Sequence, residues 1–104
     1  MNDFILIYIT NPNKAEARKI AKHLLGKKLI ACANIYNNVN SLYNWKGKIA
    51  DETEVVLITK TLDKNFEKIK TEVEKIHSYT IPCITKIPVS SNKKYFDWVK
   101  GEVE

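Results

Sequence analysis

The arrangement of hydrophobic and polar residues predicts three β-strands before residue 62. Residues 4–9 (Phe-Ile-Leu-Ile-Tyr-Ile) are apolar at every position, and so are residues 55–58 (Val-Val-Leu-Ile), which predicts two strands covered on both faces. Residues 31–45 alternate instead, and this alternation predicts a long strand with one polar face. The Lys-Gly pair at 46–47 then indicates a hairpin turn. The apolar positions of the alternating strand share one parity and are Ala33, Ile35, Val39, Tyr43 and Trp45.

Apolar residues at helical spacing predict two amphipathic helices, one after the first strand and one after the third. An Asn-Pro pair opens the first helix, with either Asn11 or Asn13 as its N-cap, and Gly26 ends it. Asp63 is the expected N-cap of the second helix, which ends near His77. The apolar faces are formed by Ala17, Ile20, Ala21, Leu24 and Leu25 in the first helix and by Phe66, Ile69, Val73 and Ile76 in the second.

The last part of the chain predicts an edge strand and a short helix. Residues 81–89 are extended, but Pro82 and Pro88 interrupt them, which restricts this strand to a sheet edge. The order β-α-β-β-α-β plus a terminal helix predicts an α+β fold with the ferredoxin-like arrangement, in a single domain spanning 1–104. One side of the closing helix is formed by Tyr95, Trp98 and Val99.

This arrangement leaves one apolar face of the sheet without a cover. Both amphipathic helices lie on the same face, and the two fully apolar strands are central. About five or six large side chains on the other face would then meet water. At about 1.5–3 kcal/mol per side chain the loss is on the order of 10 kcal/mol, as large as the stability of a whole domain. The sequence therefore predicts self-association through the open sheet face in a closed symmetric oligomer.

Composition and charge narrow the functional classes. The chain has 104 residues and a net charge of +5. Arg18 is the one arginine among 17 cationic residues, and the lysines alternate with acids, which favours a solvated lysine surface over a nucleic-acid-binding patch. No apolar run approaches the ~20 residues of a membrane helix, and no basic leader precedes the first strand, so we expect a cytoplasmic protein. Cys32 and Cys83 are too few for a disulfide scaffold.

Five segments of the chain follow a pattern that we can compare with a known family. They are Ala-Cys-Ala-Asn-Ile at 31–35, Ser-Leu-Tyr-Asn-Trp-Lys-Gly-Lys-Ile at 41–49, Ile-Thr-Lys-Thr at 58–61, His-Ser-Tyr-Thr-Ile-Pro-Cys-Ile at 77–84 and Tyr-Phe-Asp-Trp at 95–98, with Val39 and Glu54. These segments resemble the CutA divalent-cation-tolerance family, and the similarity covers nearly the whole chain. The resemblance implies a ferredoxin-like fold assembled as a homotrimer, with long hairpins that reach onto neighbouring subunits and an architecture similar to that of PII-type signalling trimers. It also implies a role in tolerance to copper and other divalent cations, and copper binding is ascribed to the family.

The metal site that this resemblance implies is reduced here. Some family members have a cysteine and a second histidine where this chain has Ile9 and Ile76. Thr80 and Cys83 stand in place of two family glutamates. His77 remains, and a Cys83 thiolate with the His77 imidazole would suit Cu(I), so we predict weak binding of copper or another divalent metal there, without an organic cofactor. Two other interpretations stay open, namely a capping or buried hydrogen-bonded His77 and a Cys83 that acts as a small buried hydrophobe.

The resemblance also implies an intersubunit cleft. Interface packing is the other interpretation for its aromatic residues. Lys60 lies in an apolar strand, so a buried amine there needs an anionic partner, which is either Glu54 or a small anionic or metal-bound ligand. A PII-like regulatory trimer that binds a small anionic ligand in this cleft is therefore an alternative function. The other interpretation of Lys60 is an amine that reaches solvent. The cleft residues are Tyr43, Trp45, Lys60 and Tyr79.

Two other functional classes fit the sequence poorly. An acylphosphatase-like enzyme needs an arginine in the first loop, and residues 10–13 contain none. An RNA-recognition module displays aromatic side chains on its central strands, and residues 55–58 contain none. We therefore predict a non-enzymatic homotrimer that acts in divalent-metal homeostasis, with RNA binding as the least favoured alternative.

Overall fold

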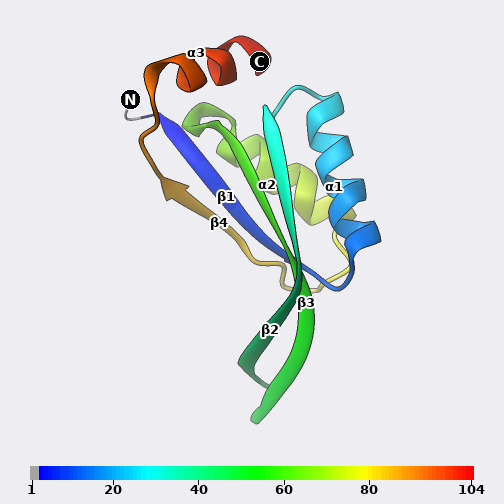
Figure 1. Cartoon of the computed structure of the whole chain (residues 1–104). Coiled ribbons are helices and arrows are strands. Elements are labelled where there is room, and N and C mark those ends of the chain that lie inside the picture. Colours follow the sequence, from blue (N-terminus) through cyan, green and yellow to red (C-terminus); the bar gives the residue numbers. More distant parts are fainter. Residues whose placement is uncertain (1–2) are drawn as a thin grey trace.

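The chain folds around one four-stranded antiparallel sheet, as the computed structural model of residues 3–104 shows (Figure 1). The strand order is β2-β3-β1-β4, so β1 and β3 are central and β4 lies at an edge, as predicted. The α+β fold and the element order are thereby confirmed. The strands are β1 Phe4–Asn11, β2 Cys32–Trp45, β3 Lys48–Leu62 and β4 Ile84–Pro88, and the helices are α1 Lys14–Gly26, α2 Phe66–Ile76 and α3 Lys93–Glu102, with a short 3-10 turn at Asp63–Asn65 before α2.

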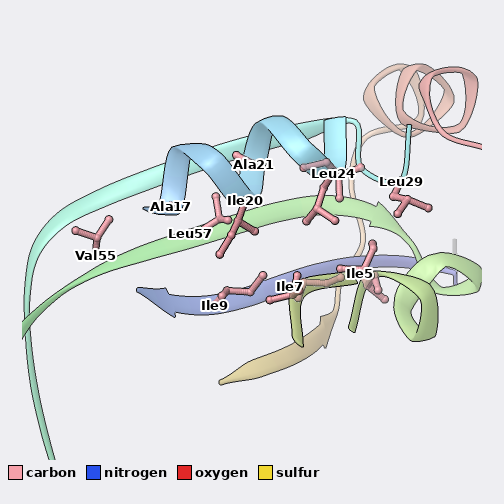
Figure 2. Close-up of a cluster of buried hydrophobic side chains, with 13 residues drawn as sticks. Ile5, Ile7, Ile9, Ala17, Ile20, Ala21, Leu24, Leu29, Val55 and Leu57 are labelled. Atoms are coloured by element: carbon pink, nitrogen blue, oxygen red, sulfur yellow. The ribbon is translucent and has the colours of Figure 1, made fainter. Parts of the chain in front are cut away.

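Helices α1 and α2 cover one face of the sheet and bury the main hydrophobic core against it (Figures 1 and 2). The odd-numbered residues of β1 point into this core, and Ile7 and Ile9 have no exposed surface. Leu57 faces them from β3, because it pairs directly with Ile9. Each such side chain contributes about 1.5–3 kcal/mol through burial, which makes this face the main source of stability. The fully buried side chains of the two helices, all predicted from helical spacing, are Ala17, Ile20, Leu24, Ile69 and Val73.

Helix α3 covers part of the opposite face, so the prediction that helices cover only one face is wrong at this end of the sheet. Phe4 pairs with Leu62, and the side chains of both point away from the main core. Val99 of α3 is fully buried in the cluster they form, and the Phe96 ring lies 5.8 Å from the Phe4 ring. Amphipathic spacing indicated that α3 has a buried side, but it carries no information about which surface receives that side.

The rest of the opposite face has only partial cover within residues 3–104. Leu6, Tyr8 and Ile58 are half-buried there. Tyr36 is 53% exposed and Ile87 is 40% exposed on the same face. The apolar surface that remains is smaller than the sequence pattern predicts, and it is continuous with the β2–β3 hairpin through Tyr36.

A β-bulge in β2 reverses the facing of the hairpin's outer half. Tyr36 pairs with Val56 and Val39 pairs with Glu54, so β2 has two residues where β3 has one. Asn38 lies inside this bulge with φ 58°, in the left-handed region that asparagine tolerates better than most residues. The prediction that Val39, Tyr43 and Trp45 share a face with Ala33 and Ile35 is therefore wrong. The three residues after the bulge face the same side as Tyr36, opposite α1 and α2.

The helix termini differ in part from the predicted ones. Asn13 caps α1, because its side-chain oxygen accepts a hydrogen bond of 2.8 Å from the Glu16 N–H. Gly26 is the last residue of α1, but the left-handed residue that follows is Lys28, with φ 56°. Asp63 is not the N-cap of α2, because it begins the 3-10 turn and Asn65 directly precedes the helix. The Asp63 carboxylate binds the Lys86 ammonium at 2.7 Å.

The β2–β3 hairpin extends well beyond the body of the molecule (Figure 1). The protein measures 45 × 24 × 22 Å, and the hairpin forms the end of the long axis that lies away from α3. Large apolar side chains are exposed along it, with Leu42 at 65% and Ile49 at 77%. No helix among the described residues is long and apolar enough to cross a membrane.

Candidate functional site

A cavity of about 810 Å³ lies where the hairpin leaves the sheet, and we call it the hairpin cavity. Its walls come from the end of β1, from β2 beyond the bulge and from the segment 78–83 that precedes β4. The bulge contributes directly, because it places Tyr43 and Trp45 on the same face as Glu54. Three predicted cleft residues and one predicted metal ligand line this cavity, namely Tyr43, Trp45, Tyr79 and Cys83, and the other lining residues are Tyr8, Thr10, Val39, Asn40, Ser41, Leu42, Asn44, Glu54, Ser78, Thr80 and Ile81.

Glu54 and Tyr79 form the polar centre of the hairpin cavity. The Tyr79 hydroxyl donates a hydrogen bond of 2.5 Å to Glu54 Oε2, and Glu54 is only 6% exposed. Burial raises the pKa of the Tyr79 phenol above its ordinary value, and the Glu54 carboxylate raises it further. The pKa of Tyr43 is also raised, by partial desolvation and by the charges of Glu52 and Glu54. Both phenols are therefore neutral at physiological pH, in a region of negative potential.

His77 lies just after α2 and ties three segments of the chain together. Its side chain has no exposed surface. The Tyr79 N–H donates to Nδ1 at 3.0 Å, so Nδ1 is the acceptor and Nε2–H donates to the Thr10 carbonyl at 2.8 Å. The imidazole also packs against the Tyr79 ring at a centroid distance of 4.7 Å. Both ring nitrogens are thus engaged in hydrogen bonds that fix the 77–79 turn against β1.

The structure does not bring His77 and Cys83 together as a ligand pair. The Cys83 sulfur contacts the Thr85 hydroxyl at 3.5 Å, and the sulfur is not hydrogen-bonded to the imidazole. Glu16 lies near the His77 ring, with Oε2 3.3 Å from Nδ1, but this oxygen already accepts hydrogen bonds from Ser78 N–H and Oγ–H. Within residues 3–104 no three His, Cys, Asp or Glu side chains converge to hold a metal ion. Metal binding by His77 and Cys83 stays a prediction.

Lys60 lies outside the hairpin cavity. It is six residues from Glu54 along β3, which separates the two by about 20 Å at the rise of an extended strand. Its ammonium lies over the Tyr95 ring of α3, 5.4 Å from the ring centroid, which is a cation–π contact and not an ion pair. Glu54 is instead bonded to Tyr79. The predicted cleft set is therefore divided within one chain, and its lysine is remote from its aromatic residues.

Tyr8 and Thr10 are not among the predicted site residues, and Glu54 is predicted to have no site role beyond a candidate ion pair with Lys60. One signal could have found Glu54, namely an acidic residue directly before four apolar positions in a central strand. A carboxylate in such a position is buried unless the strand ends there, and a buried carboxylate requires a specific partner. Tyr8 and Thr10 depend on strand pairing and on the path of segment 78–83, so no local pattern indicates them.

Comparison with known proteins identifies relatives over the whole chain. The family model described as CutA1 divalent ion tolerance protein matches residues 5–102. A protein named divalent-cation tolerance protein CutA from Archaeoglobus fulgidus is 46% identical and aligns over 100% of both chains, and the one from Thermus thermophilus is 38% identical over 91% of this chain and 93% of its own.

Solved structures agree with this match. The structure of the Archaeoglobus fulgidus protein, described there as periplasmic, superposes with a TM-score of 0.94 at 45% identity and covers 97% of this chain and 99% of its own. CutA1 from Oryza sativa gives a TM-score of 0.95 at 32% identity over 98% and 94% of the two chains. A rice relative is named as chloroplastic, so the relatives come from different compartments and the cytoplasmic location stays a prediction. The chain belongs to the CutA1 divalent ion tolerance protein family.

Proposed function

We propose that this protein is a non-enzymatic homotrimer that acts in tolerance to divalent cations, copper among them. Family membership supports the tolerance role. The exposed apolar surface of the hairpin is the observation that carries the assembly, because Ile49 is 77% exposed and Leu42 is 65% exposed on strands that project from the body. Exposed apolar surface of this kind is typical of a protein–protein interface. The hairpin and the uncovered part of the sheet around Tyr36 would then pack against neighbouring copies.

Light scattering coupled to size-exclusion chromatography tests this assembly. We expect a particle of three times the 12.0 kDa mass of the chain. Ile49→Glu and Tyr36→Glu should shift the protein toward the monomer, because a carboxylate at a desolvated interface costs several kcal/mol. Leu25→Glu is the matched control, since Leu25 is 41% exposed on α1, away from the proposed interface. A monodisperse wild-type particle of the single-chain mass would overturn the proposal.

The copper part of the proposal depends on Cys83. Its thiol lines the hairpin cavity, and a thiolate is a ligand that Cu(I) prefers. His77 would have to break its hydrogen bond to Thr10 or to the Tyr79 N–H before it could bind a metal ion. In a trimer, ligands from neighbouring copies could complete a coordination set that one chain lacks.

Copper titration of the purified oligomer separates these residues. Cys83→Ser should lower the affinity at least tenfold, whereas Cys32→Ser, a thiol on β2 outside the cavity, should leave it unchanged. His77→Ala tests the second ligand. If both Cys83→Ser and His77→Ala bind copper with wild-type stoichiometry and affinity, neither residue belongs to the site. The tolerance role is tested separately, by survival of a deletion strain in copper with and without the gene.

A further inference from the structure

The geometry points to the hairpin cavity as a binding site for a small organic cation, an ammonium or alkylammonium group, held by Glu54 against the surrounding aromatic rings. This ligand class goes beyond the proposed function, which concerns metal ions and assembly. It also differs from the anionic ligand that the sequence led us to expect, because the lysine that would have bound an anion lies elsewhere.

The charge of the cavity is the first argument for a cationic ligand. Among the described residues that line it, Glu54 alone bears a formal charge, although the chain as a whole has a net charge of +5. Only 6% of Glu54 is exposed to solvent. The Tyr79 hydroxyl binds one of the two Glu54 carboxylate oxygens, Oε2. Glu54 is the one acidic group among neutral side chains in the described lining, so its carboxylate attracts a cation to the cavity. An anion at this position would be repelled.

The aromatic walls of the cavity are the second argument for a cationic ligand. Four aromatic side chains line it, and the faces of such rings attract ammonium groups through their quadrupoles. The chain already contains one example at this place, because the Lys46 ammonium lies 5.8 Å from the centroid of the Trp45 ring. Lys46 is not among the lining residues. The four rings are those of Tyr8, Tyr43, Trp45 and Tyr79.

Within one chain the same donor set is incomplete for a metal ion, so copper at Cys83 would need further ligands from neighbouring copies. Calcium and magnesium need six or more oxygen ligands, and the cavity offers one carboxylate with hydroxyl and amide groups around it. Zinc and copper prefer several imidazole or thiolate ligands, and Cys83 is the one such side chain in the described lining. A volume of about 810 Å³ is within the usual range for organic ligands and is far larger than a dehydrated ion requires.

Titration of the intact protein with tetramethylammonium chloride tests the inference. Trp45 lines the cavity, so its fluorescence reports occupancy, and Trp98→Phe removes the other tryptophan, which lies on α3. We expect a saturable change in emission that sodium chloride at equal ionic strength does not produce. Tert-butanol, a neutral molecule of similar shape, should bind at least tenfold more weakly, because it lacks the charge that the rings and the carboxylate attract.

Two variants distinguish a ligand-binding Glu54 from a structural one. Glu54→Gln should weaken tetramethylammonium binding about tenfold or more, while Glu74→Gln, the same charge change on exposed α2 surface, should alter it less than twofold. Tyr79→Phe removes the hydroxyl that competes for the carboxylate, so this variant should bind at least as tightly as the wild type. If Glu54→Gln does not fold, Tyr43→Leu tests the aromatic wall at a position that is 40% exposed, with threefold weaker binding expected.

Three results would overturn the inference. The first is the absence of saturable tetramethylammonium binding to the wild type. The second is equal affinity for tetramethylammonium and tert-butanol, which would show an apolar cavity without charge selection. The third is an unchanged affinity in Glu54→Gln, or a loss in Tyr79→Phe as large as that in Glu54→Gln, because the pair would then act only as a structural hydrogen bond. None of these results bears on the trimer, and copper binding is tested separately by Cys83→Ser, which leaves Glu54 and the four rings in place.

Discussion

Replacement of His77 by alanine distinguishes a structural histidine from a metal ligand. The imidazole donates to the Thr10 carbonyl at 2.8 Å and accepts from the Tyr79 N–H at 3.0 Å, with no exposed surface on the side chain. Alanine removes both bonds and leaves the partly buried Tyr79 N–H and Thr10 carbonyl without these partners. The 77–79 turn then loses its attachment to β1, and the wall of the hairpin cavity formed by Tyr79 should loosen with it.

The size of the effect follows from these contacts. Two hydrogen bonds contribute about 1 kcal/mol each, and an unpaired buried backbone group costs about 1–3 kcal/mol. A loss of about 3 kcal/mol is therefore expected in His77→Ala. At about 4 °C per kcal/mol for a domain of this size, the Tm should fall by roughly 12 °C.

Thermal unfolding with and without metal ions is the assay. Wild type and His77→Ala are compared at equal protomer concentration, because the stability of an oligomer depends on concentration. Each is measured in EDTA and again with copper or zinc. A structural role predicts the same difference in Tm under both conditions, whereas a metal-ligand role predicts a larger difference with metal. His77→Asn is the control, because its amide oxygen can still accept the Tyr79 N–H, and it should recover part of the loss. A His77→Ala Tm within about 2 °C of the wild type would refute the structural reasoning.

Three further predictions concern the body of the molecule. Glu72 has a pKa of about 2, lowered from 4.5 by hydrogen bonds from His23 and Lys27. Its ionised form therefore stabilises the fold fully above pH 4.5. This contribution disappears as the pH falls toward 2. The Tm difference between wild type and Glu72→Gln should accordingly be full at pH 6 and vanish near pH 2, and a constant difference would contradict the ion pairs. Leu57→Ala, in the centre of the sheet with no exposed surface, should cost about 2–5 kcal/mol in urea unfolding. Lys28→Gly should stabilise the protein by roughly 0.5–1 kcal/mol, because glycine adopts the φ of 56° without strain, and a loss of stability would show that other contacts of Lys28 dominate.

Much of the fold was predictable because its signals are local. Apolar runs located β1 and β3, two-residue alternation located β2, and helical spacing located α1, α2 and α3. The Asn13 cap was one of two candidates in the sequence. The two prolines correctly restricted the last strand to an edge. These features depend on residues that are neighbours in the chain, so the sequence contains them directly.

The site was less predictable because it depends on pairing between distant segments. Nothing in Asn37 or Asn38 by itself indicates that two residues of β2 stand opposite one of β3, and the facing of every later hairpin residue depends on this. The partner of Lys60 is an aromatic ring of α3, which the strand pattern cannot reveal. The role of His77 depends on a carbonyl group 67 positions earlier.

The bulge makes the hairpin sensitive to the length of its sequence as well as to its composition. Deleting Asn37 or Asn38 would remove the bulge and restore simple alternation in β2. Every β2 side chain between the deletion and the hairpin turn would then lie on the opposite face of the hairpin. Leu42 and Asn44 would then point where Tyr43 and Trp45 do now, and the aromatic wall would be presented to the opposite side. Related chains that keep these aromatic residues but differ by one residue in this stretch should therefore place their rings on the other side of the hairpin.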